Sequence, residues 1–165
     1  MAEHESIRRT TPVTYALLGG LIAGVLDIVY ALVFFGFRGV PAQRVLQSVA
    51  SGLLGSRSYE GGAATASLGL ALHFALMLVI ALIFYGFARR IRWLIERPYL
   101  AGAAYGVIVY WTMNLVVLPL SAYPGTFAWH PIVVPAGVVN HAVMIGIPIA
   151  LGVRAGLLTR SPSAS

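Results

Sequence analysis

The sequence contains no cysteine and no lysine, and it has few charged residues of either sign. The absence of cysteine excludes disulfides, thiolate metal sites and thiol redox chemistry. Charged residues make up 10% of the 165 residues, whereas a soluble domain usually has about 25%. Hydrophobic residues make up 59%, and the mean hydropathy is +0.85. This composition argues against a soluble enzyme, a nucleic-acid-binding module and a disordered protein, and it predicts a small polytopic membrane protein.

Long uncharged runs indicate where the chain crosses the membrane. They lie between Arg9 and Arg38 (interrupted only by Asp27), between Glu60 and Arg89, and from Pro98 to Val153. A bilayer core of about 30 Å needs roughly 20 apolar residues per helix. We therefore predict an all-α fold, a four-transmembrane-helix bundle over residues 14–153, with spans near 14–36, 64–87, 99–121 and 132–153. Cytoplasmic tails over 1–13 and 154–165 would flank this membrane domain.

All basic residues are arginines, and they are distributed unequally between the two sides of these spans. Eight fall on the side of the termini and the second loop: Arg8, Arg9, Arg89, Arg90, Arg92, Arg97, Arg154 and Arg160. Three fall on the opposite side: Arg38, Arg44 and Arg57. Because arginine is enriched in cytoplasmic loops, we expect a multi-pass protein of the bacterial inner membrane with both termini in the cytoplasm. The net charge of +6 then reflects orientation and contact with membrane lipids, and no nucleic-acid partner is expected.

The first outer loop contains a helix pattern of its own. Pro41 can begin a helix and Gly55 can end it. An apolar stripe of Val45, Leu46, Val49 and Leu53 stands opposite Arg44, Gln47, Ser48 and Ser51. This pattern predicts a short interfacial helix on the outer leaflet, and a helix packed across the mouth of the bundle is the alternative.

Each predicted span has a face of small residues, which allow helices to approach closely in lipid. These faces contain Gly20, Gly24 and Ala31; Ala66 and Gly69; Gly102 and Gly106; and Gly137 and Gly152. Helical spacing puts the most polar residue of each span on the same face: Asp27, His73, Asn114 and His141, with Tyr110 and Asn140 beside them. At about 1.5 Å of rise per residue, these polar residues fall in one band in the outer half of the membrane. We predict that they form one intramembrane cluster.

Ionisable side chains within a membrane are costly and usually functional, and histidine titrates near physiological pH. The cluster therefore predicts a proton or polar-ligand site in a small transporter-like or ligand-binding protein, with no catalytic residues. A second hypothesis is that the cluster only joins helices in a structural or accessory subunit. A transport path through so small a protein would require a homo-oligomer or a membrane partner.

Two cofactor hypotheses follow from the histidines. His73 and His141, on different helices at similar depth, could ligate haem b on both faces of its iron, which would make the protein an electron carrier. Asp27, His73 and His141 together could ligate a divalent metal by ligand type. No metal motif with short spacing accompanies them, so neither cofactor is the leading prediction.

Dispersed sequence features resemble the YagU-like inner-membrane proteins of bacteria. They are Gly20-Leu-Ile-Ala-Gly24, His73 at the start of an apolar run, Leu100-Ala-Gly-Ala103, Pro119-Leu120, an outer proline-aromatic turn, and His141 early in the fourth span. The first outer loop, with Arg44 and Gln47, departs from the family pattern, and Asp27 has no counterpart in it. The resemblance implies a role in envelope physiology, since the family is associated with acid tolerance.

Overall fold

A computed structural model describes residues 11–159, and this part of the chain is helical with no strands. Four stretches are long and apolar enough to cross a membrane: Pro12–Gly36, Gly62–Ala88, Pro98–Leu120 and Val133–Leu158. The first two are α1 (Pro12–Gly36) and α3 (Gly62–Ala88). The third consists of α5 (Pro98–Thr112), η2 (Met113–Val117) and α6 (Leu118–Leu120), and the fourth of α7 (Val133–Asn140), η3 (His141–Gly146) and α8 (Ile147–Leu158). The predicted all-helical fold with four helices of spanning length is confirmed.

The helix ends agree with the predicted spans except at the C-terminus. The fourth helix continues to Leu158 instead of ending at residue 153. In this added turn Gly156 packs closely against Pro12 of α1, and Arg154 donates a hydrogen bond from Nη1 to the carbonyl oxygen of Ile95, at 2.9 Å, in the short α4 (Trp93–Glu96). Most of the two predicted tails, residues 1–10 and 160–165, lies outside the described residues.

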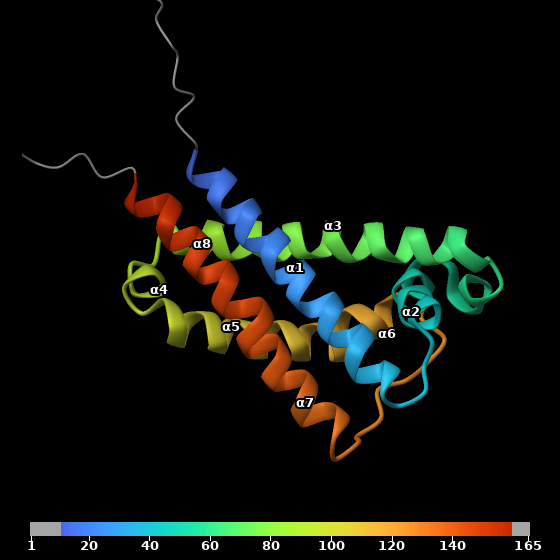
Figure 1. The fold of residues 1–165 in the computed structure, drawn as a ribbon. Helices are drawn as coiled ribbons and strands as arrows, with labels where there is room; N and C mark the ends of the chain where they lie inside the picture. Colours follow the sequence, from blue (N-terminus) through green and yellow to red (C-terminus); the bar gives the residue numbers. More distant parts are fainter. Residues whose placement is uncertain (1–10, 160–165) are drawn as a thin grey trace, which may run out of the picture.

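Close backbone contacts at glycines join the fourth span to α1 and to α5. A Cβ atom on Gly152 of α8 would lie 2.7 Å from the carbonyl oxygen of Tyr15 in α1, and one on Gly102 of α5 would lie 2.7 Å from that of Gly146 in η3. Such contacts bring α8 against both α1 and α5, and the described ends of the chain lie together at one end of the bundle (Figure 1). We call this the terminal end. Small residues thus allow the backbone contact that drives helix association in lipid.

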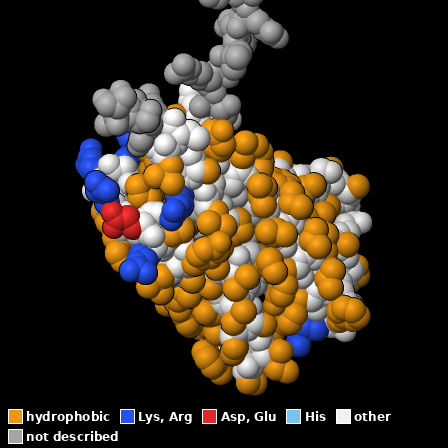
Figure 2. Space-filling view, turned by 60° about the vertical axis from the view of Figure 1, so that its left-hand side comes forward, with side chains coloured by type: hydrophobic (Ala, Val, Ile, Leu, Met, Phe, Trp, Pro, Cys, Tyr) orange, Lys and Arg blue, Asp and Glu red, His pale blue; other side chains and the backbone are white. Residues whose placement is uncertain are grey.

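The exterior of the bundle is apolar, as a membrane-spanning fold requires. Large hydrophobic side chains remain exposed along all four long helices. In the space-filling view this apolar surface separates arginines at one end of the molecule from arginines at the other (Figure 2). The buried core is formed by residues such as Phe84, Ile145 and Ile149.

The loop after α1 contains the expected helix, α2 (Ala42–Leu54), but its orientation differs from the predicted one. Gln47 and Ser51, expected on the polar face, are buried, whereas Leu53 is 61% exposed. The burial of Gln47 is compensated because its Nε2 donates hydrogen bonds to the carbonyl oxygen of Gly62 (3.1 Å) and to Oγ1 of Thr65 (3.2 Å). The predicted apolar stripe is therefore wrong in its details, and α2 packs against α3.

The same packing corrects the expected role of Gly69. A Cβ atom at this position would lie 1.9 Å from the carbonyl oxygen of Leu46, so Gly69 admits the backbone of α2. Sequence reasoning had assigned Gly69 to contacts among the four spans. The short helix α2 occupies that face instead, where Gln47 donates hydrogen bonds to α3.

Candidate functional site

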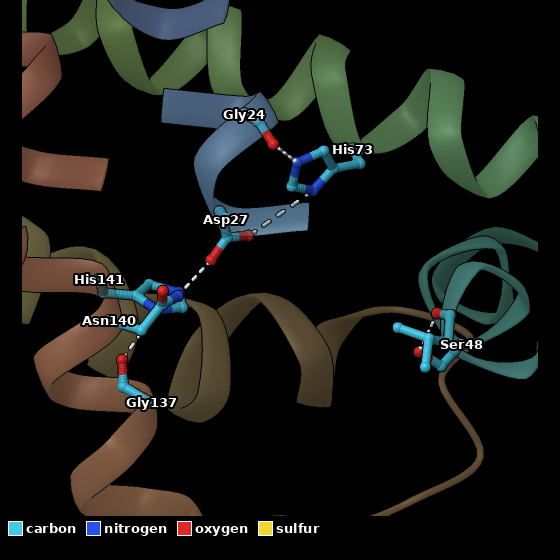
Figure 3. A network of polar contacts seen from close by, with 8 residues as sticks. Gly24, Asp27, Ser48, His73, Gly137, Asn140 and His141 are labelled. Carbon is cyan, nitrogen blue, oxygen red and sulfur yellow. Dashed lines mark hydrogen bonds and ion pairs between the residues drawn. The ribbon is translucent and has the colours of Figure 1, made fainter. Parts of the chain in front are cut away.

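Asp27 of α1 is the centre of the polar cluster, and it contacts two other helices (Figure 3). Its Oδ1 accepts a hydrogen bond from Nδ2 of Asn140 at the end of α7. Its Oδ2 lies 3.9 Å from Nδ1 of His73 in α3. The structure therefore brings three of the predicted site residues, from three helices, into direct proximity.

The second ring nitrogen of His73 determines the hydrogen positions in this cluster. Nε2 of His73 lies 2.9 Å from the carbonyl oxygen of Gly24. Because a carbonyl oxygen can only accept, Nε2 must carry a hydrogen. In the neutral ring Nδ1 then has a lone pair, and this lone pair faces the Asp27 carboxylate across 3.9 Å. Two acceptors face each other, so the pair has a place for one additional proton, on Oδ2 or on Nδ1.

Gly24 makes this arrangement possible by its lack of a side chain. A Cβ atom there would lie 2.9 Å from the ring of Phe74 and 3.3 Å from Met77. The absence of that atom lets α3 approach α1, and His73 reaches a backbone carbonyl. The His73 side chain is buried and only 5% of the residue is exposed. The Asp27–His73 pair thus lies between two tightly packed helices.

Asn140 and His141 complete the cluster from the fourth span. Asn140 is 5% exposed, and within residues 11–159 its buried Oδ1 has no hydrogen-bond partner. Nδ1 of His141 lies 3.0 Å from the carbonyl oxygen of Gly137 and must therefore carry a hydrogen, which leaves Nε2 as an acceptor in the neutral ring. The ring of Tyr110 packs edge-on against that of His141, with centroids 5.1 Å apart.

Two π-helical turns present residues of the site. In η2, which contains Asn114, the N–H of Leu118 bonds to the carbonyl oxygen of Met113, and in η3, which begins at His141, the N–H of Ile147 bonds to that of Ala142. Each turn ends two residues before a proline, Pro119 or Pro148. A proline lacks an N–H and its ring clashes with the carbonyl four residues earlier, and a π turn widens the helix at that place. The prolines thus account for the irregular backbone beside the cluster.

Two cavities adjoin the cluster. The smaller has a volume of about 230 Å³ and is lined by Asp27, Tyr30, Ala31, Phe34, Phe35, Tyr110, Asn114, Val133, Gly137, Asn140 and His141. The larger has a volume of about 510 Å³ and is mostly apolar, lined by residues of α1, α2, α3 and the third span, with Tyr123 and His141. Phe35 and His141 line both cavities. The cavity that contains Asp27 and the more apolar cavity therefore meet at these two residues.

Some of the predicted site residues lie beside Asp27, and others only line the smaller cavity. Asp27, His73 and Asn140 are in direct proximity, and Asp27, Tyr110, Asn114, Asn140 and His141 line the smaller cavity. Asn114 makes no hydrogen bond to the cluster, because its Nδ2 donates to the carbonyl oxygen of Tyr110 in its own helix, at 2.8 Å. Sequence reasoning missed the aromatic lining by Tyr30, Phe34 and Phe35. Their spacing on α1 around Asp27 was the available signal, but aromatic residues are too common in apolar helices for it to stand out.

The contacts of the histidines bear on the cofactor hypotheses. Among residues 11–159, no three His, Cys, Asp or Glu side chains are grouped so that they could hold a metal ion. His73 already uses Nε2 for Gly24 and turns Nδ1 toward Asp27. His141 uses Nδ1 for Gly137 and keeps Nε2 available. Ligation by His73 would therefore require the loss of one of its two contacts.

No protein-family model, curated protein or solved structure matches this chain. The resemblance to the YagU-like proteins therefore stays a prediction from the residues.

Proposed function

We propose that this chain is a small multi-pass protein of the bacterial inner membrane that binds a proton or a small polar ligand at Asp27, in a transporter-like or ligand-binding role. Both termini lie in the cytoplasm in this proposal, and the cluster lies in the outer half of the bilayer. The arginine distribution supports this orientation.

The single observation that supports a proton site best is the pairing of Asp27 with His73. The hydrogen bond to Gly24 turns a lone pair of the neutral His73 ring toward the carboxylate. An ionised Asp27 beside a neutral histidine would leave one uncompensated charge in an apolar region, which is costly. One bound proton removes this net charge whichever atom holds it, so the pair has a physical reason to bind and release a proton.

Infrared spectroscopy of the full chain in lipid nanodiscs tests the proposal. Across a pH titration, we expect the C=O band of a protonated carboxylic acid to appear or a His73 ring signal to change in step with Asp27. Asp27→Asn should abolish the response, and His73→Gln should shift its midpoint because the partner is lost. Nuclear magnetic resonance of ¹⁵N-labelled histidine would identify the nitrogen that takes the proton.

Asn114→Ala is the matched control, because Asn114 lines the same cavity but bonds within its own helix. It should leave the titration unchanged. If Asp27 and His73 keep one protonation state over the whole range in which the protein stays folded, the site does not bind protons. The proton part of the proposal would then be wrong.

A further inference from the structure

We propose that the two adjacent cavities bind a hydrophobic amine in its protonated form, with the ammonium group beside Asp27 and the apolar body in the larger cavity. This inference rests on the proposed function and names the ligand class of the same site.

The smaller cavity has hydrogen-bond acceptors that need donors. They are the carboxylate of Asp27 and Nε2 of the neutral His141 ring, and Asn140, which also lines the cavity, has a buried Oδ1 without a partner among the described residues. A buried acceptor without a partner costs about 1–3 kcal/mol. A primary ammonium group supplies three N–H donors and a positive charge, so it matches this set in both respects. A carboxylate, phosphate or ether would add acceptors to acceptors.

The charge of the cavity walls also favours a cation. Asp27 is the only Asp, Glu, Lys or Arg on the walls of either cavity, as far as the chain is described. Arg44 lines a separate neighbouring cavity, and its guanidinium carbon lies 4.6 Å from the ring centroid of Tyr59. Arg38 lies over the Phe34 ring, with its guanidinium carbon 5.8 Å from the centroid, but among the described residues no arginine forms an ion pair with Asp27.

Aromatic rings surround the place where the charge would lie. Tyr30, Phe34, Phe35 and Tyr110 line the smaller cavity together with Asp27. Tyr30 and Phe34 are stacked, with centroids 5.4 Å apart. A desolvated cation near aromatic faces gains about 2 kcal/mol. A carboxylate among aromatic rings is thus the chemistry that recognises an organic ammonium group.

The lining and volume of the larger cavity indicate the size and polarity of the rest of the ligand. It shares Phe35 and His141 with the smaller one, and side chains such as Leu72, Leu76 and Val117 line it. A volume of about 510 Å³ lies within the range of roughly 300–1,000 Å³ that is usual for small-molecule sites. The ligand is therefore an amine with a substantial aryl or alkyl body rather than ammonia or a polyamine.

When the ammonium ion binds, it replaces the proton of the Asp27–His73 pair. With its proton the Asp27–His73 pair is neutral, and when the ammonium ion binds, that proton leaves to solvent while the amine nitrogen keeps its own hydrogens. The pair then has one negative charge, balanced by the one positive charge of the ligand. The same carboxylate thus cannot hold both ions, which is the condition for coupling an amine to a proton.

Binding of phenylbutylamine to the full chain in nanodiscs of zwitterionic lipid tests this inference. We expect saturable binding with release of one proton, and a loss of roughly 30-fold or more in affinity in Asp27→Asn, which removes the charge pair. Phenylbutanol has the same body without charge, and phenylbutyltrimethylammonium has charge without N–H donors. Both should bind more weakly than the amine. Size-exclusion chromatography and circular dichroism would show that Asp27→Asn is folded.

A second pair of variants tests the larger cavity without changing the cluster. Gly52 lines it, and a Cβ there would meet nothing closer than 3.8 Å, so Gly52→Leu fills space without a backbone clash. Gly86 has open space around it, and Gly86→Leu is the matched control. Gly52→Leu should lower the affinity for phenylbutylamine by about fourfold for each methylene group of the ligand that is no longer buried. Gly86→Leu should leave the affinity unchanged.

Equal binding of the amine to wild type and Asp27→Asn, or equal binding of phenylbutanol and phenylbutylamine, would mean partition into lipid and would overturn the inference. If amine binding fails while the infrared titration of Asp27 succeeds, the ligand class is wrong and the proton site stands. If the titration also fails, the proposed function is wrong as well.

Discussion

Asp27 and Asn140 lie 113 positions apart in the chain and yet form the hydrogen bond that joins α1 to the fourth span. Interhelical hydrogen bonds in membranes contribute modestly, from about 0.6 to 2 kcal/mol. The contact therefore positions the carboxylate more than it stabilises the fold. Positioning matters here because the opposite oxygen of the same carboxylate faces His73.

A double-mutant cycle measures this contact. Asp27→Ala and Asn140→Ala, alone and combined, should give a coupling free energy of about 1 kcal/mol in unfolding by sodium dodecyl sulfate followed by circular dichroism. The reason is that each single change leaves one buried polar group without its partner. The control cycle pairs Asp27→Ala with Asn114→Ala, and it should be additive because Asn114 bonds to its own helix. Additivity in both cycles would contradict the assigned contact.

The π turns and the glycines act together at the level of helices. Gly106 of α5 faces the beginning of η3, where a Cβ atom would lie 2.1 Å from the carbonyl oxygen of His141. Backbone atoms cannot move aside as flexible side chains do, so this contact requires glycine. The same contact places His141 beside Tyr110 and the smaller cavity.

Gly106→Ala should therefore destabilise the bundle by about 1–3 kcal/mol, the range for overpacking. Gly86→Ala, the same change in α3 with nothing within 4 Å, should be neutral or stabilise by up to about 1 kcal/mol because alanine favours a helix. Detergent unfolding curves of both variants provide the measurement. Similar losses in the two variants would show that the approach of α5 and η3 is not tight.

At the level of the whole molecule, α1 begins where α8 ends. A Cβ atom on Gly156 would lie 2.6 Å from the carbonyl oxygen of Pro12. The opposite end contains α2, the short 3₁₀ helix η1 (Gly55–Tyr59) and the loop before α7. Since the described chain ends at Thr159 on the terminal side, labelling of one site at each end determines the orientation.

The absence of cysteine makes that experiment simple. Ser56→Cys and Thr159→Cys introduce single thiols at exposed positions at the two ends. In intact bacterial cells, a membrane-impermeant maleimide should label Ser56→Cys, while Thr159→Cys should react only after permeabilisation, because we propose that the arginine-rich end faces the cytoplasm. The reverse pattern would show the opposite orientation. Labelling of both in intact cells would show dual insertion.

Apolar run length was enough to predict the four helices of spanning length, and residue spacing predicted a polar residue on the small face of each. Both depend on local physics: a bilayer of given thickness requires a helix of given length, and helical periodicity determines which residues share a face. The buried face of α2 could not be predicted in this way. Gln47 is buried only because Gly62 and Thr65 of another segment accept its hydrogen bonds.

Sequence alone also predicted that Asp27 and the histidines share one depth, but not which atoms meet. The tertiary structure decided that His73 binds Gly24, that Asn140 rather than Asn114 reaches Asp27, and that Phe35 and His141 stand between two cavities. These outcomes depend on how closely helices distant in the chain approach and rotate against one another. Glycine contacts and proline-induced π turns set that approach, and neither is visible in the periodicity of a single helix.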